Sequence, residues 1–162
     1  MNKKIKFFIG LDDTDHLDVG CTTEKFNQLL IYLDENINCE IISRRLVRLW
    51  PFANRRTRGN AALSAIILLN INEEQKLYDI CDQWFQILLS EISTHPISDC
   101  PASPVLLISK SNFSNKIYWE TVKSHVDLNS RLSEIKEYDC KVFSGESNWG
   151  LVGTSAAISW NP

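Results

Sequence analysis

The sequence predicts a single α/β domain in which helices cover a mixed central sheet. The chain has 162 residues, 44% of them hydrophobic and 23% charged, which suits one domain with a full hydrophobic core. Short apolar runs alternate along the chain with longer stretches whose apolar residues recur at helical spacing. We find no internal repeat or linker, and therefore expect the domain to extend over residues 1–162.

The first half of the chain contains three predicted strands and one predicted helix. Residues 5–11 and 61–71 are apolar runs of the kind found in buried strands. In residues 40–49 arginines alternate with apolar side chains, and Trp50-Pro51 ends this strand because proline cannot continue a ladder. Apolar spacing predicts a helix from Thr22 to about Asn36, with Thr22 or Thr23 as its cap.

The second half adds a long amphipathic helix from Glu73 to about Ser93. Residues 151–159 are almost all small, so their pattern does not decide between a helix and a strand. The remaining predicted elements are a buried strand at 105–109, two helices at 116–126 and 128–138, and a strand at 141–143.

Charge and cysteine content exclude several classes of protein. The net charge of −3 gives no global field that would attract nucleic acid. The five cysteines are an odd number and form no C-x-x-C pair, which argues against a disulfide framework or a zinc ribbon. The apolar segment after Met1 is too short for a membrane span and runs into Asp12. We therefore expect reduced thiols, no membrane partner and a cytoplasmic location.

Four carboxylates, of Asp12, Asp13, Asp15 and Asp18, lie within seven residues directly after the first predicted strand. They repel one another, and a divalent cation among their oxygens would make such a cluster favourable. The plainer interpretation is a solvated turn whose aspartate caps the next helix. We favour metal or phosphate chemistry for this cluster.

Six of the seven arginines fall between Arg44 and Arg58, with no acidic residue among them. A solvated strand edge protected by charge is the plainer interpretation, but lysine is the usual residue there. The guanidinium group matches phosphate oxygens bidentately, so this stretch predicts a site for an anion such as a polyphosphate. The candidate nucleotide-binding residues here are Arg48, Arg56, Thr57, Arg58, Gly59 and Asn60.

Weaker candidates lie elsewhere in the chain. Gly150 and Gly153 begin a segment that can present backbone N–H groups to phosphate, although it lacks the P-loop pattern. His16 adjoins the acidic cluster, whereas we expect His95 and His125 to be ordinary surface residues.

Four blocks, in order, resemble the catalytic domain of the archaeal tRNA-Ile 2-agmatinylcytidine synthetase family. Leu11-Asp12-Asp13-Thr14-Asp15 with Gly20-Cys21-Thr22-Thr23 resembles its G-I-D-D-T-D-S and G-x-C-T-T-Y signature. Residues 45–49 with 57–62 are similar to its R-L-V-R-L-N-P and K-T-R-G-N-A-A block. Residues 100–104 resemble its C-P-N-T-N-P loop, and residues 150–158 its G-R-G-L-I-G-A-L-A-A-I ending.

The resemblance implies a kinase-like domain that uses ATP and Mg²⁺ to phosphorylate the C2 carbonyl oxygen of a tRNA cytidine, after which agmatine displaces the phosphate. It implies that Asp12, Asp13 and Asp15 hold the metal and that Arg56, Arg58 and Asn60 hold nucleotide phosphates. Thr22 matches a threonine that is itself phosphorylated. The catalytic residues expected on these grounds are Asp12, Asp13, Thr22 and Arg58.

The chain also departs from the family pattern. His16, Glu24, Trp50, Arg56 and Trp149 replace the family's Ser, Tyr, Asn, Lys and Arg. The family's ferredoxin-like, OB-fold and zinc-ribbon parts have no counterpart in these residues, so tRNA binding is expected to need a partner protein. The acceptor, RNA cytidine or a small molecule, stays open. Two alternatives also stay open: a nucleotide-binding regulatory module without turnover, and a metal-dependent phosphohydrolase.

Overall fold

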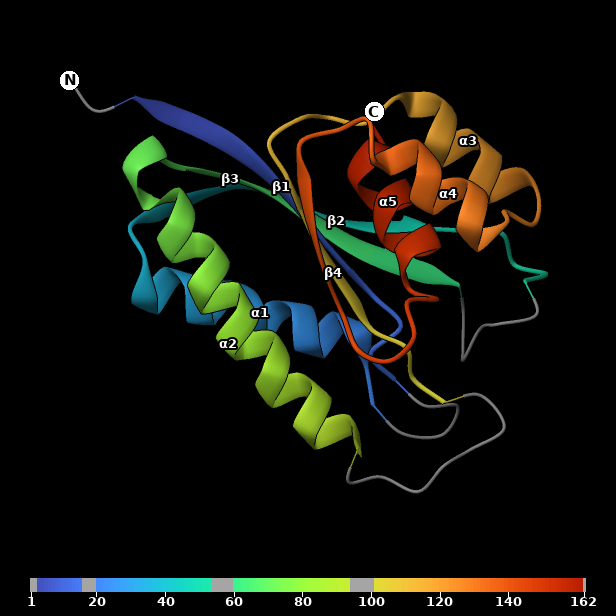
Figure 1. The fold of residues 1–162 in the computed structure, drawn as a ribbon, viewed down its shortest axis with the longest axis horizontal. Coiled ribbons are helices and arrows are strands. Elements are labelled where there is room, and N and C mark those ends of the chain that lie inside the picture. The colour runs from blue at the N-terminus through green and yellow to red at the C-terminus, as the bar shows by residue number, and fades with distance from the viewer. Residues whose placement is uncertain (1–2, 16–19, 54–59, 94–100, 162) are drawn as a thin grey trace.

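A computed structural model describes residues 3–15, 20–53, 60–93 and 101–161. In these residues one sheet lies between two layers of helices (Figure 1). The strands are β1 (Lys4–Asp12), β2 (Cys39–Arg48), β3 (Ala61–Asn70), β4 (Val105–Ser109) and β5 (Cys140–Ser144). The helices are α1 (Thr22–Asn36), α2 (Glu74–Ser93), α3 (Asn115–Lys123), α4 (Leu128–Ile135) and α5 (Leu151–Ser159), and a 3-10 turn, η1 (Ile71–Glu73), precedes α2.

The strands have the order β2-β3-β1-β4-β5, and each neighbouring pair is antiparallel. The predicted α/β domain is therefore confirmed, but its sheet is antiparallel rather than mixed. The reason is that β3 inserts between β1 and β2, and β1 inserts between β3 and β4. The helices α1 and α2 thus join strands that run the same way without being neighbours, which is the split β-α-β-β-α-β arrangement.

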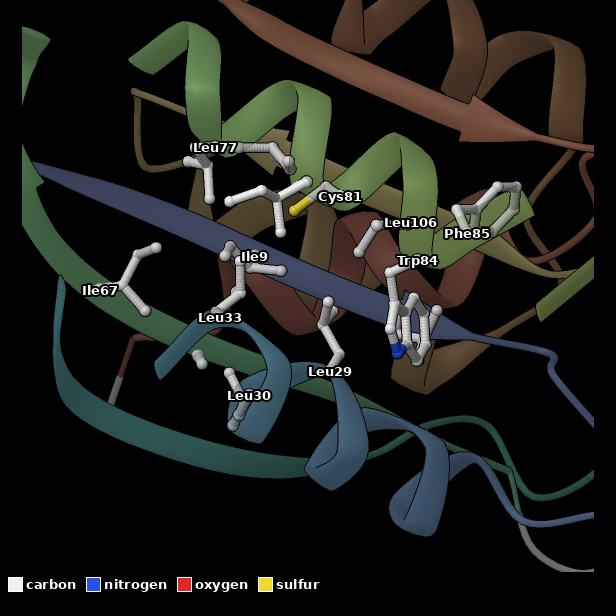
Figure 2. Packing of buried hydrophobic residues seen from close by; sticks show 14 of the residues in the cluster. Ile9, Leu29, Leu30, Leu33, Ile67, Leu77, Cys81, Trp84, Phe85 and Leu106 are labelled. Atoms are coloured by element: carbon white, nitrogen blue, oxygen red, sulfur yellow. The ribbon is translucent and has the colours of Figure 1, made fainter. Parts of the chain in front are cut away.

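Helices cover both faces of the sheet. The helices α1 and α2 pack on one face, where Leu29, Leu33, Leu77 and Phe85 are buried against strand residues such as Ile9 (Figure 2). The helices α3, α4 and α5 cover the other face (Figure 1). Burial of β1, β3 and β4 from both sides accounts for the apolar runs that predicted them.

The segment that the sequence left undecided, residues 151–159, is the helix α5. It packs directly on β1, because Gly10 has no side chain: a Cβ there would lie 2.7 Å from Thr154 Cγ2 and 3.1 Å from Ile158 Cγ1. Every residue of α5 except Val152 is buried. Its small side chains therefore allow the helix to approach the sheet closely.

Three local predictions differ from the structure. The helices α3 and α4 are shorter than predicted, ending at Lys123 and Ile135, and Ser124 has the extended backbone that closes α3. Cys21, not a threonine, is the N-cap of α1, and it makes no side-chain capping hydrogen bond. The Thr22 hydroxyl is instead bonded to the preceding loop, as described below.

The predictions about thiols and membrane segments concern the whole chain. Of the described cysteines, Cys21, Cys39, Cys81 and Cys140 are free, with no disulfide between any two of them. Within the described ranges, no helix has both the length and the apolar character needed to cross a membrane.

Candidate active site

A cavity of about 490 Å³ lies at the end of the sheet where β1 and β2 finish and β3 begins. The described residues that line it form three walls. The first wall, from the end of β1 and the start of α1, contains Asp12, Asp13, Asp15, Cys21, Thr22 and Thr23. The second, between β2 and β3, contains Leu46, Arg48, Leu49, Trp50, Ala53, Asn60, Ala61 and Leu63. The third, from the end of α3 and the start of α5, contains Thr121, Ser124, His125, Val126, Trp149, Val152 and Gly153.

In the first wall the chain turns sharply after β1. Asp13 has a φ of 59°, the left-handed region that residues other than glycine seldom adopt, although aspartate tolerates it better than most. Its carbonyl oxygen accepts a hydrogen bond of 3.0 Å from the Ser103 N–H. Such strained residues cluster at functional sites. The turn places the predicted carboxylates Asp12, Asp13 and Asp15 along one cavity.

The Thr22 hydroxyl joins α1 to this turn. It donates a 3.0 Å hydrogen bond to Asp15 Oδ1 and accepts one of 3.0 Å from the Thr14 hydroxyl. Thr14 and Thr22 are both buried, with 3% and 8% of their surfaces exposed. Thr22 is therefore held in one orientation with its proton directed at a carboxylate, the pairing of hydroxyl and base that nucleophilic catalysis uses.

Asp12 lies against the first turn of α5. A Cβ added to Gly153 would fall 1.8 Å from Asp12 Oδ2, so only glycine leaves room for this carboxylate. A negative charge at this end of a helix is favoured by the helix dipole. The N–H of Gly150 donates to the Ser103 carbonyl oxygen at 3.0 Å, and a Cβ there would meet three backbone atoms within 3.0 Å. Both glycines thus serve close packing, and their phosphate-binding role stays a prediction.

The second wall carries the described part of the arginine-rich stretch. Arg48 is exposed at the end of β2 and lines the cavity. Asn60 connects β2 to β3, because its carbonyl oxygen accepts from the Leu49 N–H at 2.7 Å and its Nδ2 donates to the Trp50 carbonyl oxygen at 2.9 Å. The predicted residues Arg56, Thr57, Arg58 and Gly59 lie outside the described residues, as do His16 and His95.

Arg45, in the same stretch, does not line the cavity. Its Nη1 donates to the Trp160 carbonyl oxygen, and its guanidinium lies 5.8 Å from the centre of the Trp160 ring. Burial lowers the pKa of Arg45. Alternation along β2 separates the two roles, since neighbouring side chains of a strand point to opposite faces.

The third wall contains residues that the sequence did not single out for this site. His125 was expected to be an ordinary surface residue, and the structure shows it exposed but lining the cavity, just beyond the end of α3. Ser103, which supports this wall without lining the cavity, was also not singled out, although it lies in the proline-containing loop at 100–104. Its hydroxyl accepts from the Trp149 N–H at 2.9 Å and lies 2.6 Å from the Ser147 hydroxyl. No periodic pattern marks either residue, because their roles depend on contacts between segments distant in sequence.

The acidic wall fits a metal ion held jointly by the protein and a nucleotide better than a metal ion held by protein ligands alone. Across the described ranges, no three carboxylate, histidine or cysteine side chains gather closely enough to form a metal-binding group. Magnesium commonly binds through one or two carboxylates and substrate phosphates while keeping several waters. Carboxylates at the cavity wall therefore fit Mg²⁺ brought with a nucleotide, and they do not form a protein-only cage.

Comparison with known proteins identifies the family. The family model described as the TiaS TCKD domain matches residues 8–147, which is most of the chain. The chain belongs to the TiaS TCKD domain family. The resemblance found in the four sequence blocks is thereby confirmed.

Two similar proteins show how much of a TiaS sequence the match covers. The tRNA 2-agmatinylcytidine synthetase TiaS of Caldivirga maquilingensis is 30% identical over 153 residues, which cover 93% of this chain and 35% of that protein. The TiaS of Thermoplasma volcanium is 27% identical over 172 residues, covering 94% of this chain and 38% of that protein. The chain thus spans little more than a third of these relatives.

Solved structures of TiaS share the fold of this TCKD family member. The complex of TiaS with its isoleucine tRNA and ATP matches with a TM-score of 0.80 and 22% identity, over 97% of this chain and 36% of that one. The complex of TiaS with the same tRNA, AMPCPP and agmatine matches with a TM-score of 0.73 and 20% identity, over 95% of this chain and 36% of that one.

Proposed function

We propose that this domain is an ATP- and Mg²⁺-dependent phosphotransferase that acts in RNA modification, with an RNA cytidine as acceptor. The observation that carries the proposal is the Thr22 hydroxyl, which is hydrogen-bonded to the Asp15 carboxylate in a cavity that also contains Asp12, Asp13 and Arg48. Phosphoryl transfer needs positioned oxygens, carboxylates for a metal, and positive charge near the phosphates. The relative from Caldivirga maquilingensis is a tRNA 2-agmatinylcytidine synthetase, and a similar solved structure is a complex of TiaS with tRNA and ATP. Both support an ATP-dependent reaction on RNA.

Autophosphorylation of Thr22 would follow from its hydrogen bonds. The Thr22 oxygen would form a bond to the γ-phosphorus of ATP while the bond from that phosphorus to the β–γ bridging oxygen breaks and ADP leaves. The hydroxyl proton would pass to Asp15, its hydrogen-bond acceptor at 3.0 Å. Thr14 orients the attacking oxygen. Asp12 and Asp13 would hold Mg²⁺, which neutralises charge on the phosphate oxygens when it is bound.

Arg48 and Asn60 would bind nucleotide phosphates from the second wall. Arg48 is the described arginine that lines the cavity, and the backbone of Asn60 is fixed between two strands. We propose that Arg56, Thr57, Arg58 and Gly59 complete this site, on the strength of the arginine-rich pattern and the family resemblance.

Incubation of the protein with γ-labelled ATP and Mg²⁺ tests the proposal. We expect label on the wild type and its loss in Thr22→Ala, Asp15→Asn and Asp13→Ala. Thr23→Ala is the matched control, because Thr23 is the exposed neighbour on the same wall and makes none of the hydrogen bonds of Thr22. Label lost in Thr23→Ala but kept in Thr22→Ala would contradict the assignment of Thr22.

The burial of Thr22 favours one alternative. With 8% of its surface exposed, Thr22 can stabilise the turn without being phosphorylated, as in a nucleotide-binding module without turnover. ATP binding by calorimetry without labelling would establish that alternative, and the absence of both would contradict the nucleotide site. The phosphohydrolase gains no support, since the described lining residues include no lysine and no acidic residue beyond the cluster at residues 12–15.

A further inference from the structure

The third wall of the cavity differs chemically from the other two. Its described residues include no aspartate, glutamate, lysine or arginine, and Val126, Val152 and Trp149 make much of it apolar. Trp149 is 48% exposed, unlike most large apolar side chains of the domain. A partly aromatic wall without carboxylate, ammonium or guanidinium groups suits a flat uncharged ring, whereas carboxylates and a guanidinium suit a metal and phosphates.

The backbone around Trp149 is fixed. The Trp149 N–H donates to the Ser103 hydroxyl at 2.9 Å, and the following Gly150 N–H donates to the Ser103 carbonyl oxygen at 3.0 Å. The next residue begins α5. An aromatic side chain on a fixed backbone loses little conformational freedom when a ligand stacks on it. Trp149 thus lines the cavity from a backbone that is held in place on both sides of Ser103.

Ser103 also connects Trp149 to the acidic wall. The Ser103 N–H donates to the Asp13 carbonyl oxygen at 3.0 Å, so one residue bridges the indole-bearing segment and the turn that carries the carboxylates. Trp149 is therefore anchored to the turn that carries the carboxylates, and it lines the same cavity as they do. In ATP the adenine is the part furthest from the γ-phosphate. A ring bound beside the carboxylates is consequently expected to come from the acceptor rather than from adenine.

We propose that Trp149 forms the binding subsite for the acceptor nucleobase, which stacks on the indole with its reacting oxygen toward the acidic wall. The inference rests on the proposed function, because it presumes a nucleotide donor at the other two walls. Stacking on an aromatic side chain binds single-stranded bases with little sequence preference. The subsite thus supplies affinity for a base, and its choice among bases would come from neighbouring polar groups.

Indole N–H resonances in a ¹H–¹⁵N spectrum test the subsite. Cytidine is titrated into ¹⁵N-labelled protein saturated with AMPCPP and Mg²⁺, and Trp149→Ala identifies the Trp149 signal. We expect that signal to shift with cytidine. The Trp119 signal should stay in place, because Trp119 does not line the cavity. Trp119 is a matched control, since it is 50% exposed and Trp149 is 48% exposed. Trp149→Ala should weaken cytidine binding about tenfold more than AMPCPP binding, and Trp149→Phe should restore most of it.

Two results would overturn the assignment. An unmoved Trp149 signal, with AMPCPP bound, would reject the subsite while leaving the nucleotide site intact. A loss of AMPCPP affinity in Trp149→Ala as large as the loss of cytidine affinity would place adenine on the indole instead. Failure of the wild type to bind AMPCPP at all would reject the proposed function, and with it this subsite.

Discussion

Single residues at the site are constrained by contacts that cross the fold. Gly153 is the clearest case, because the Asp12 carboxylate lies where a side chain at residue 153 would project. The N-terminal end of α5 thereby receives a negative charge from β1. Glycine is needed at residue 153 to leave room for this carboxylate, a requirement that the sequence alone does not reveal.

We expect Gly153→Ala to destabilise the protein although alanine favours helix. The new Cβ would lie 1.8 Å from Asp12 Oδ2 and 3.1 Å from Leu49 Cδ1. Overpacking of this kind costs about 1–3 kcal/mol, more than the gain of about 1 kcal/mol in helix propensity. Urea unfolding measures the change, and nucleotide binding should weaken with it. Gly145→Ala is the control, since its Cβ would meet only the Leu89 side chain; equal stability of both variants would contradict the argument.

Arg131 is a second residue whose role the sequence does not reveal. It is fully buried between α3, α4 and α5, where Nη1 donates to the Thr121 and Ser155 hydroxyls at 3.0 and 3.3 Å. Glu120 and Glu134 lie 3.3 and 3.4 Å from its guanidinium nitrogens. Burial lowers the pKa of Arg131, and the two carboxylates oppose that shift. Arg131 thus holds together the helices that form the third wall.

We expect Arg131→Ala to lower the free energy of unfolding by about 3 kcal/mol, because it leaves a cavity and removes the cation beside Glu134, while Glu120 keeps its ion pair with Lys116. Arg131→Lys should restore only part of this, since an ammonium cannot reach the hydroxyls and both carboxylates with the guanidinium geometry. Chemical denaturation measures both variants. Full stability of Arg131→Lys would show that charge alone is needed.

Whole elements were predicted well where hydrophobic pattern determines them. The strands β1, β2 and β3 and the helices α1 and α2 begin and end within about two residues of the prediction, since their apolar periodicity matches their burial. The helix α5 could not be identified, because a segment buried on all sides has no polar face and hence no period. The order of the strands in the sheet could not be predicted either, because the local hydrophobic pattern does not show which strands pair.

The site was predicted in part for the same reason. Its acidic and arginine-rich walls are compact runs of sequence, so composition reveals them. The third wall joins residues from α3, α5 and the loops beside them. No local pattern indicates that His125 and Trp149 share a cavity, because they come together only after α3 and α5 pack on the same face of the sheet.

The short helix α4 depends on its cap. Asp127 Oδ2 accepts hydrogen bonds from the Ser130 N–H at 2.9 Å and the Ser130 hydroxyl at 3.1 Å, and these bonds lower the pKa of Asp127. A carboxyl whose folded pKa is lowered stabilises the protein above its unfolded pKa, about 3.9, and loses this effect as the pH falls through the folded value.

We therefore expect Asp127→Ala to melt below the wild type at pH 7, with the difference shrinking below about pH 4. Asp127→Asn keeps an acceptor oxygen and does not titrate. Its advantage over Asp127→Ala should consequently persist at low pH. Thermal melts of the three proteins from pH 7 to pH 3 measure this, and parallel curves for wild type and Asp127→Ala would contradict the role of the carboxylate.

At the scale of the whole molecule, the arginines are concentrated in one stretch of the chain, whereas the lysines are spread along it. The net charge is −3, while six arginines fall between residues 44 and 58, and Arg48 among them lines the cavity. Binding of RNA by this chain should therefore be weak and should depend on that one end of the sheet.

We expect the affinity for a single-stranded RNA to fall as salt rises. Each phosphate contact contributes a slope of about −0.7 in a plot of log affinity against log salt concentration. Arg48→Gln should reduce the slope by about that amount. Lys76→Gln removes the same charge near the start of α2, beyond the other end of β3, and should leave the slope unchanged. Fluorescence anisotropy measures both, and equal effects would show that binding responds only to net charge.

The left-handed backbone of Asp13 sets folding against chemistry at one position. Replacement by glycine would remove the conformational penalty at a φ of 59°, which is about 1 kcal/mol, and replacement by alanine would keep it. We expect Asp13→Gly to unfold at higher urea than Asp13→Ala, while both lose labelling by γ-labelled ATP. A ranking of these two variants by stability alone would therefore place glycine above alanine at residue 13 and would not detect that both have lost the carboxylate.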